Sequence, residues 1–215
     1  MTPLYTAATT LEHIARYCSD NYLEVAGAFI GLLYLYLEYK ASSLLWIVGI
    51  IMPAIYIFVY YDAGLYADFG ISIYYVIAAI YGWAVWTLGK RKDGGRPYLP
   101  ITHTPRCLIL PLALVFALLW AACGLILTHY TDSTVPWSDA FTTALSVVGM
   151  WLLARKHLEQ WLAWILVDAV SVVLYIYKEL YFTTALYALY TVIAILGYRK
   201  WKQLMHSASY PHTKP

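Results

Sequence analysis

The stretch LILPLALVFALLWAACGLILT, residues 108–128, contains no charged side chain and indicates which solvent surrounds this chain. An apolar segment of about 20 residues is long enough to cross the hydrocarbon core of a bilayer as a helix. The remainder of the 215 residues agrees, because 62% are hydrophobic, only 12% are charged and the mean hydropathy is +0.62. This composition is too apolar for a soluble domain, so we predict an integral membrane protein.

Six further apolar segments have lengths suited to membrane helices. The fifth span in chain order is short for a full crossing. Polar, turn-rich stretches occupy residues 89–106 and 129–139 on either side of the fourth span, and no segment suits a soluble domain. We therefore predict an all-α, polytopic fold of seven transmembrane helices. The predicted spans are 23–39, 43–60, 69–88, 108–128, 140–153, 161–177 and 183–198.

Basic residues are distributed unevenly between the two predicted sides of the membrane. Cytoplasmic loops carry the excess of Lys and Arg in membrane proteins, whereas only Arg16 and Lys178 fall on the opposite side here. The asymmetry predicts an external N-terminus and a cytoplasmic C-terminus, which an odd number of spans also requires. The cytoplasmic set comprises Lys40, Lys90, Arg91, Lys92, Arg96, Arg106, Arg155, Lys156, Arg199, Lys200, Lys202 and Lys214.

The region 46–86 is repeated in the region 161–201. A shift of 115 positions, from 46 to 161, aligns eleven identical residue pairs without a gap, including Trp46 with Trp161. This predicts two parallel three-helix repeats joined by a connector helix, a 3+1+3 plan like that of SWEET-type sugar transporters, in which the solute binds between the repeats. A duplicated scaffold without a pathway is the alternative.

The repeat divides the chain into five parts. We predict an extracytoplasmic segment at 1–22 and a first three-helix repeat at 23–88. Residues 89–138 would hold a cytoplasmic loop, the connector helix and an external loop. A second repeat at 139–201 and a cytoplasmic tail at 202–215 would follow.

The two repeats differ at one chemically informative position, where Pro53 in the first matches Asp168 in the second. A carboxylate in the middle of a span costs about 2.5 to 3.5 kcal/mol on insertion scales, so Asp168 should face an interior cavity. Helical spacing places Trp161, Trp164 and Tyr175 on the same stripe, which suits a flat organic cation. The alternative is a structural acid among packing aromatic residues.

Two other helices contribute candidate binding residues. Ser72 and Tyr75 share one face of the third span, and Tyr187 and Tyr190 share one face of the seventh. Cys18, Cys107 and Cys123 have no metal-ligand spacing, so we expect neither a zinc site nor a disulfide framework. The sequence has no phosphate-binding loop, nucleophile pair or dinucleotide motif, so we expect neither an enzyme nor a cofactor, and no basic aromatic stripe predicts nucleic-acid binding.

Two stretches resemble the PnuC family of vitamin transporters: YADFGISIYYVIAAIYGWAVW, residues 66–86, and RKHLEQWLAWILVDAVSVVLYIYKELY, residues 155–181. The motifs that carry the resemblance are YGW at residues 81–83 and the Trp161, Trp164, Asp168 pattern. The resemblance covers nearly the whole chain. It implies a seven-helix facilitator that passes an unphosphorylated vitamin down its gradient, after which phosphorylation inside the cell traps the vitamin.

The residues that depart from the family pattern concern the substrate. Nicotinamide riboside transporters of this family usually carry Gln where this chain has Ser72, and Asn where it has Ala79 and Asp168. The missing amides and the added charge favour thiamine, with nicotinamide riboside as the alternative and riboflavin third. The resemblance also implies a bacterial cytoplasmic membrane, a cytoplasmic kinase or pyrophosphokinase as functional partner, and leaves open a homo-oligomer. A membrane sensor that binds the vitamin without transporting it is the alternative from another class.

Overall fold

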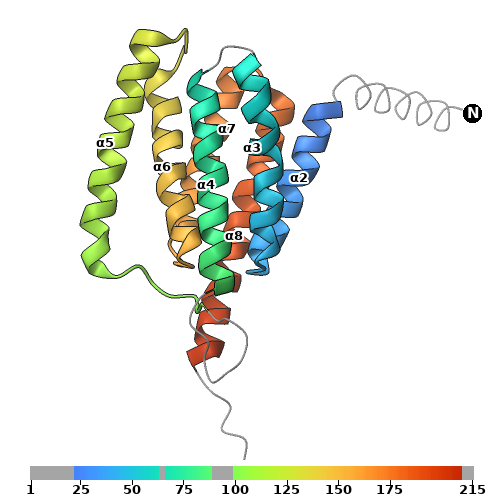
Figure 1. Cartoon of the computed structure of the whole chain (residues 1–215), viewed down its shortest axis with the longest axis vertical. Coiled ribbons are helices and arrows are strands. Elements are labelled where there is room, and N and C mark those ends of the chain that lie inside the picture. The colour runs from blue at the N-terminus through green and yellow to red at the C-terminus, as the bar shows by residue number, and fades with distance from the viewer. Residues whose placement is uncertain (1–21, 63–65, 89–98, 210–215) are drawn as a thin grey trace, which may run out of the picture.

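The computed structural model describes residues 22–62, 66–88 and 99–209, and these residues form seven helices and no strand (Figure 1). The prediction of an all-α fold with seven helices is therefore confirmed. The predicted N-terminal segment, the basic stretch at residues 90–96 and the last residues of the tail lie outside the described residues. The helices are α2 (Tyr22–Tyr39), α3 (Leu44–Asp62), α4 (Tyr66–Leu88), α5 (Arg106–Tyr130), α6 (Pro136–Ala154), α7 (Gln160–Tyr177) and α8 (Tyr181–Ser209).

Five of these helices, α3, α4, α5, α7 and α8, are long and apolar enough to cross a membrane. Helix formation satisfies all backbone hydrogen bonds within each segment, as a bilayer requires. Helix α6 falls below that hydropathy, although its 19 residues are as many as those of α3. Small buried residues such as Ala140, Ala144 and Gly149 line α6, because it packs inside the bundle. It therefore needs less apolar surface towards lipid.

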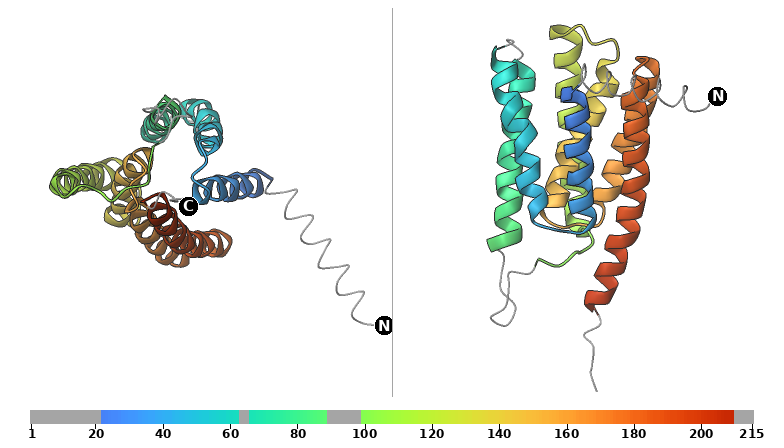
Figure 2. Two further views of the ribbon diagram at one scale, coloured as in Figure 1. Left: turned by 90° about the horizontal axis from the view of Figure 1, so that it is seen from below. Right: turned by 90° about the vertical axis from the view of Figure 1, so that its right-hand side faces the viewer.

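Six helices form a closed ring, and α5 stands outside it (Figure 2). The order around the ring is α2, α3, α4, α6, α7 and α8, with α8 returning to α2. Among the described helices, α5 packs against α6 alone. The contacts that join the first half of the chain to the second half are α2 with α8 and α4 with α6. Each half thus places its first helix against the third helix of the other half.

Equivalent tryptophan contacts occur in the two halves of the chain. Trp46 on α3 packs edge-on against Trp86 on α4, with ring centroids 5.5 Å apart and an interplanar angle of 89°. Trp161 on α7 packs in the same way against Trp201 on α8, at 5.6 Å and 87°. These are the residues that the shift of 115 positions superposes. The turns before α3 and α7 also correspond, since Ala41 and Lys156 both adopt positive φ, 50° and 54°.

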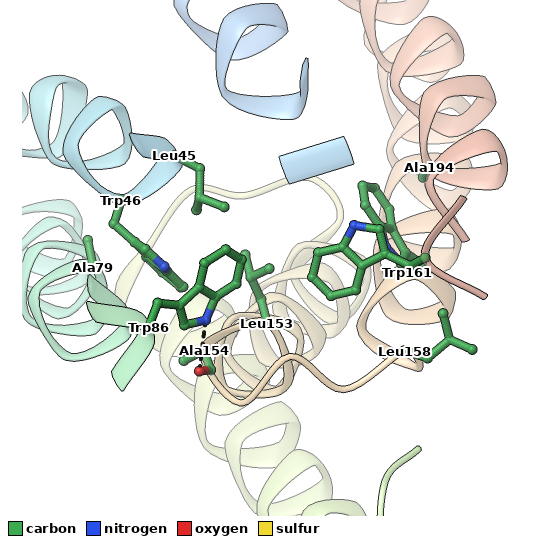
Figure 3. Close-up of a cluster of buried hydrophobic side chains, with 10 residues drawn as sticks. Leu45, Trp46, Ala79, Trp86, Leu153, Ala154, Leu158, Trp161 and Ala194 are labelled. Atoms are coloured by element: carbon green, nitrogen blue, oxygen red, sulfur yellow. Dashed lines mark hydrogen bonds between the residues drawn. The ribbon is translucent and has the colours of Figure 1, made fainter. Parts of the chain in front are cut away.

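The four tryptophans belong to a buried cluster at the end of the bundle where α2 and α6 finish (Figure 3). The Trp86 indole donates a hydrogen bond to the Ala154 carbonyl at 3.1 Å, and the Trp201 indole donates one to the Glu38 carbonyl at 2.9 Å. The third helix of each half is thus fastened to the end of the first helix of the other half. Bulky rings and two crossed hydrogen bonds close this end of the bundle. The cluster also contains Leu45, Ala79, Leu153, Leu158 and Ala194.

Most of the described Lys and Arg residues gather around the same closed end. Lys40 follows α2, Arg106 begins α5, and Arg155 and Lys156 follow α6. At the opposite end, Lys178 pairs with Asp139 at 3.4 Å and joins the α7–α8 turn to the start of α6. The predicted charge asymmetry therefore separates the two ends of the bundle. Helix α8 continues past its predicted end and carries the basic residues Arg199, Lys200 and Lys202, so the beginning of the predicted tail is helical.

The segment before α5 is fastened to the start of α7 at the closed end. Thr102 exchanges backbone hydrogen bonds with Lys156 and Leu158, at 3.1 and 2.9 Å. The Glu159 carboxylate accepts two bonds of 2.7 Å from Thr104, through its backbone nitrogen and its hydroxyl, and lies 2.7 Å from His103 Nδ1. Burial alone would raise the pKa of Glu159, but the bonds from His103 and Thr104 outweigh it and hold the pKa below its usual range.

Candidate functional site

A cavity of about 260 Å³ lies inside the helix ring, above the tryptophan cluster. Helices α2, α4, α6, α7 and α8 all contribute to its wall. Five of the eight predicted site residues line it, namely Tyr75, Trp164, Asp168, Tyr187 and Tyr190. Its other lining residues are Gly31, Tyr34, Leu35, Glu38, Ser146 and Val167.

Asp168 provides a carboxylate in the middle of α7 and has only 7% of its surface exposed. Its neighbour one turn earlier, Trp164, faces the same cavity. Among the described residues, no Lys, Arg or His lines this cavity, and no ion pair satisfies Asp168. The prediction that this acid faces the interior agrees with the structure. A buried carboxylate without a basic partner favours a positively charged ligand.

Aromatic rings surround the carboxylate. Tyr187 packs against Tyr190 with ring centroids 5.5 Å apart, and against Tyr175 at 5.0 Å. Tyr75 on α4 lines the same cavity, and its ring centroid lies 5.5 Å from that of Tyr74, whose hydroxyl is turned to α6 and donates to the Val147 carbonyl at 3.2 Å. Ring faces attract cations and stack on flat heterocycles, so this wall suits a flat cationic ring.

A second cavity of about 220 Å³ adjoins the first. The two share Gly31, Tyr34, Tyr75 and Trp164 in their walls. Ala79 lines the second cavity, at the position where the family resemblance implies an amide. The two volumes together fall in the range of small-molecule binding sites, which begins at about 300 Å³.

Three predicted site residues do not line either cavity. Trp161 is completely buried and packs against Gly197 and Trp201. Tyr175 lies behind Tyr187, and Ser72 is buried within the helix packing. The helical stripe on α7 is therefore divided: Trp164 and Asp168 face the cavity, while Trp161 lies below it in the closed end. The Trp161 ring occupies the glycine notch, the space left on α8 because Gly197 has no side chain. This packing explains why Trp161 lies below the cavity.

Glu38 is a cavity residue that sequence analysis assigned no role. It lies in the last turn of α2, has 1% of its surface exposed and lines the same cavity as Asp168. The signal that could have found it is the rule applied to Asp168, because a carboxylate within a predicted span should face an interior. Its place at the end of a predicted span, two residues before Lys40, is equally typical of a solvated charge at the membrane surface.

The comparisons with known proteins agree with this arrangement. The family model described as "Nicotinamide mononucleotide transporter" matches residues 21–203. The chain belongs to this family. The match includes all of α2 to α7, most of α8 and all the residues that line the two cavities.

Curated relatives within the family carry the names of vitamin transporters. The nicotinamide riboside transporter PnuC of Escherichia coli is 25% identical over 84% of this chain and 85% of that protein. The riboflavin/roseoflavin transporter RibM of Streptomyces davaonensis is 29% identical over 83% of each chain. A crystal structure of the vitamin B3 transporter PnuC shares the fold with a TM-score of 0.68 and 21% identity, over 95% of this chain and 91% of that chain.

Membership in this family supports a multi-pass membrane transporter of a small vitamin, as the resemblance implied. The relatives named above give no support to thiamine, which was the favoured substrate. Their names fit the alternative, nicotinamide riboside, better. The residue differences at Ser72, Ala79 and Asp168 therefore do not by themselves identify the substrate.

Proposed function

We propose that the protein transports an unphosphorylated, flat cationic vitamin across the membrane, with nicotinamide riboside as its first candidate. The observation that carries this proposal is the position of Asp168, a buried carboxylate inside an aromatic-walled cavity that no basic residue lines. A pyridinium or thiazolium ring would pair with the carboxylate and stack on Trp164 or Tyr187. Each desolvated ring face contributes about 0.5 to 2 kcal/mol.

The charge of the cavity argues against phosphorylated solutes. Two carboxyl groups, those of Asp168 and Glu38, face it, and no basic side chain of the described residues offsets them. A phosphate ester would bring further negative charge into a poorly solvated space, where like charges repel strongly. The family description mentions a mononucleotide, whereas the relatives' names specify the riboside. The acidic lining supports the riboside.

The choice of nicotinamide riboside rests on the relatives' names, and thiamine is the second candidate. Ala79 lines the adjoining cavity and offers no hydrogen bond to a ribose. Asp168 adds a charge where the resemblance implies an amide, and thiamine carries an aminopyrimidine whose amino group could donate to a carboxylate. Ala79 and Asp168 therefore favour thiamine, and the titration below includes it.

We also propose passage between two parallel three-helix repeats, with α5 as connector and the N-terminus outside. The equivalent tryptophan pairs and the exchanged contacts of the two halves support this plan. Such folds change access by moving one repeat against the other around a fixed site. Net uptake would then be facilitated diffusion, followed by phosphorylation in the cytoplasm.

Calorimetric titration of the purified protein tests the substrate. Nicotinamide riboside, thiamine and riboflavin would be compared with nicotinamide mononucleotide and thiamine monophosphate. We expect the riboside to bind most tightly and both phosphate esters to bind at least about 100-fold more weakly than their parent vitamins, a difference of about 2.7 kcal/mol. Equal binding of an ester and its parent would contradict the role of the acidic lining.

A further inference from the structure

The cavity has a second polar group at its closed end. Glu38 is 1% exposed, and its carboxyl faces the cavity directly above the tryptophan cluster. The Trp201 indole holds the backbone of this residue by donating to its carbonyl at 2.9 Å. The acid is therefore fixed at the base of the cavity by the same contact that closes the bundle.

Gln160 lies beside Glu38 and is completely buried. It is the first residue of α7, two turns before Asp168, which corresponds to about 12 Å along the helix axis. Among the described residues, no partner has hydrogen-bonding geometry to Glu38 Oε1 or to either atom of the Gln160 amide. The Gln160 amide lies against the Glu38 carboxyl as a poorly aligned hydrogen-bond partner, and of these two residues only Glu38 lines the cavity.

Buried polar atoms without a well-aligned partner are rare in folded proteins, because an unsatisfied buried polar group costs about 1 to 3 kcal/mol. An apolar pair of the same volume would fit the base of the cavity without that cost. Retention of a carboxyl at the cavity wall, with an amide beside it, points to a ligand group that completes the hydrogen bonds of the carboxyl. The carboxyl offers acceptor atoms to which a hydroxyl group of a ligand can donate.

We propose that Glu38, positioned by Gln160, forms a second anchoring site, which binds a terminal hydroxyl group of the solute while Asp168 holds its cationic ring. The inference rests on the proposed function, since it assumes that a vitamin occupies this cavity. In nicotinamide riboside the 5′-hydroxyl lies farthest from the ring and would reach the closed end. The site would make the protein selective for solutes with a free hydroxyl at that end.

A double-mutant cycle between protein and ligand tests this assignment. The ligands are nicotinamide riboside and its 5′-deoxy analogue, titrated by calorimetry against the wild type, Glu38→Met and Gln160→Met. Wild-type protein should bind the analogue at least about ten-fold more weakly than the riboside. In each variant that ratio should fall to about two or less, because Glu38→Met removes the carboxyl that recognises the hydroxyl and Gln160→Met removes the partner that positions it. Glu179→Gln, an exposed acid outside the cavity, serves as the control and should keep the wild-type ratio.

Thermal stability without ligand supplies a second readout. Because each single substitution leaves the other buried polar group without its neighbour, the double variant Glu38→Met/Gln160→Met, which removes both groups at similar volume, should melt at the wild-type temperature or above it. A lower melting temperature of the double variant together with an unchanged ligand ratio would mean that the two residues are structural, and would overturn the assignment. Equal weakening of both ligands would overturn it too.

Failure of the proposed function would look different. If the wild type binds neither nicotinamide riboside, thiamine nor riboflavin, the function itself is wrong, and the anchoring site with it. If thiamine is the vitamin bound, the same ratio is measured with thiamine and its analogue lacking the hydroxyethyl hydroxyl. Tight binding of the parent vitamin with an unchanged ratio in both variants would leave the function standing and reject the anchoring site alone.

Discussion

Replacement of Gly197 by Ala should disturb the closed end of the bundle more than any exposed glycine substitution. A Cβ atom at this position would lie 2.5 to 2.6 Å from three ring atoms of Trp161. Carbon atoms in good contact lie about 3.5 to 4.0 Å apart, so the overlap is close to 1 Å. Trp161 cannot rotate away freely, because it is completely buried and Trp201 packs edge-on against it.

The expected cost follows from two opposing effects. Overpacking of a tight core costs about 1 to 3 kcal/mol. Ala in place of Gly inside a helix returns about 0.5 to 1 kcal/mol. The net destabilisation is therefore about 1.3 kcal/mol at the midpoints of these ranges, which lowers the melting temperature of a chain of this size by about 3 to 5 °C. Thermal unfolding in detergent, followed by tryptophan fluorescence, measures it.

Gly70→Ala on α4 is the matched control, because a Cβ atom there meets nothing within 4 Å. Its melting temperature should equal or slightly exceed that of the wild type. Gly82→Ala should resemble Gly197→Ala, since its Cβ would overlap the ring of Trp46. If Gly197→Ala melts like Gly70→Ala, Trp161 does not occupy the glycine notch. It would then be available to line the solute pathway, as the sequence predicted.

Three further predictions concern charge and orientation. Asp168→Asn should weaken binding of a cationic vitamin by about 1.5 to 3 kcal/mol without loss of fold, as measured by calorimetry; unchanged affinity would make this acid structural. Burial lowers the pKa of Lys156 to about 8, so the unfolded chain binds more protons between about pH 8 and 10.5 and stability should rise with pH there. Thermal melting at several pH values should show that rise in the wild type relative to Lys156→Met, and parallel curves would contradict it. In a cysteine-free background, an impermeant thiol reagent should label Ser133→Cys from outside and Lys202→Cys only from the cytoplasm, whereas labelling of both from one side would refute the orientation.

Hydropathy predicted the helices well because lipid imposes the same rule on every span. Helix α6 was the exception: the predicted span covered residues 140–153, but the helix extends over Pro136–Ala154. Because α6 lies inside the bundle, fewer of its residues need to be apolar. Hydropathy therefore does not mark where this helix begins and ends. Helix α8 was also underestimated, because hydropathy marks the membrane boundary at Tyr198 while the helix continues to Ser209, with Trp201 fastened to α2.

The candidate site could be predicted in part from helical spacing. Spacing correctly placed Trp164 and Asp168 on one face, and a buried charge correctly pointed to a cavity. It could not separate Trp161 from Trp164, because both lie on the same stripe and only the notch at Gly197 on α8 determines which ring is enclosed. The burial of Glu38 could not be predicted for a similar reason, because it depends on contacts with α7 and α8, which are distant in sequence.

Flux of labelled nicotinamide riboside into liposomes containing the purified protein tests the central proposal most directly. We predict entry without ATP or an ion gradient until the internal and external concentrations are equal. Entry should be blocked by excess unlabelled riboside, resistant to the mononucleotide, and reduced in the Asp168→Asn variant. Saturable binding of the riboside without any flux above that of protein-free liposomes would contradict transport and would identify the protein as a vitamin sensor.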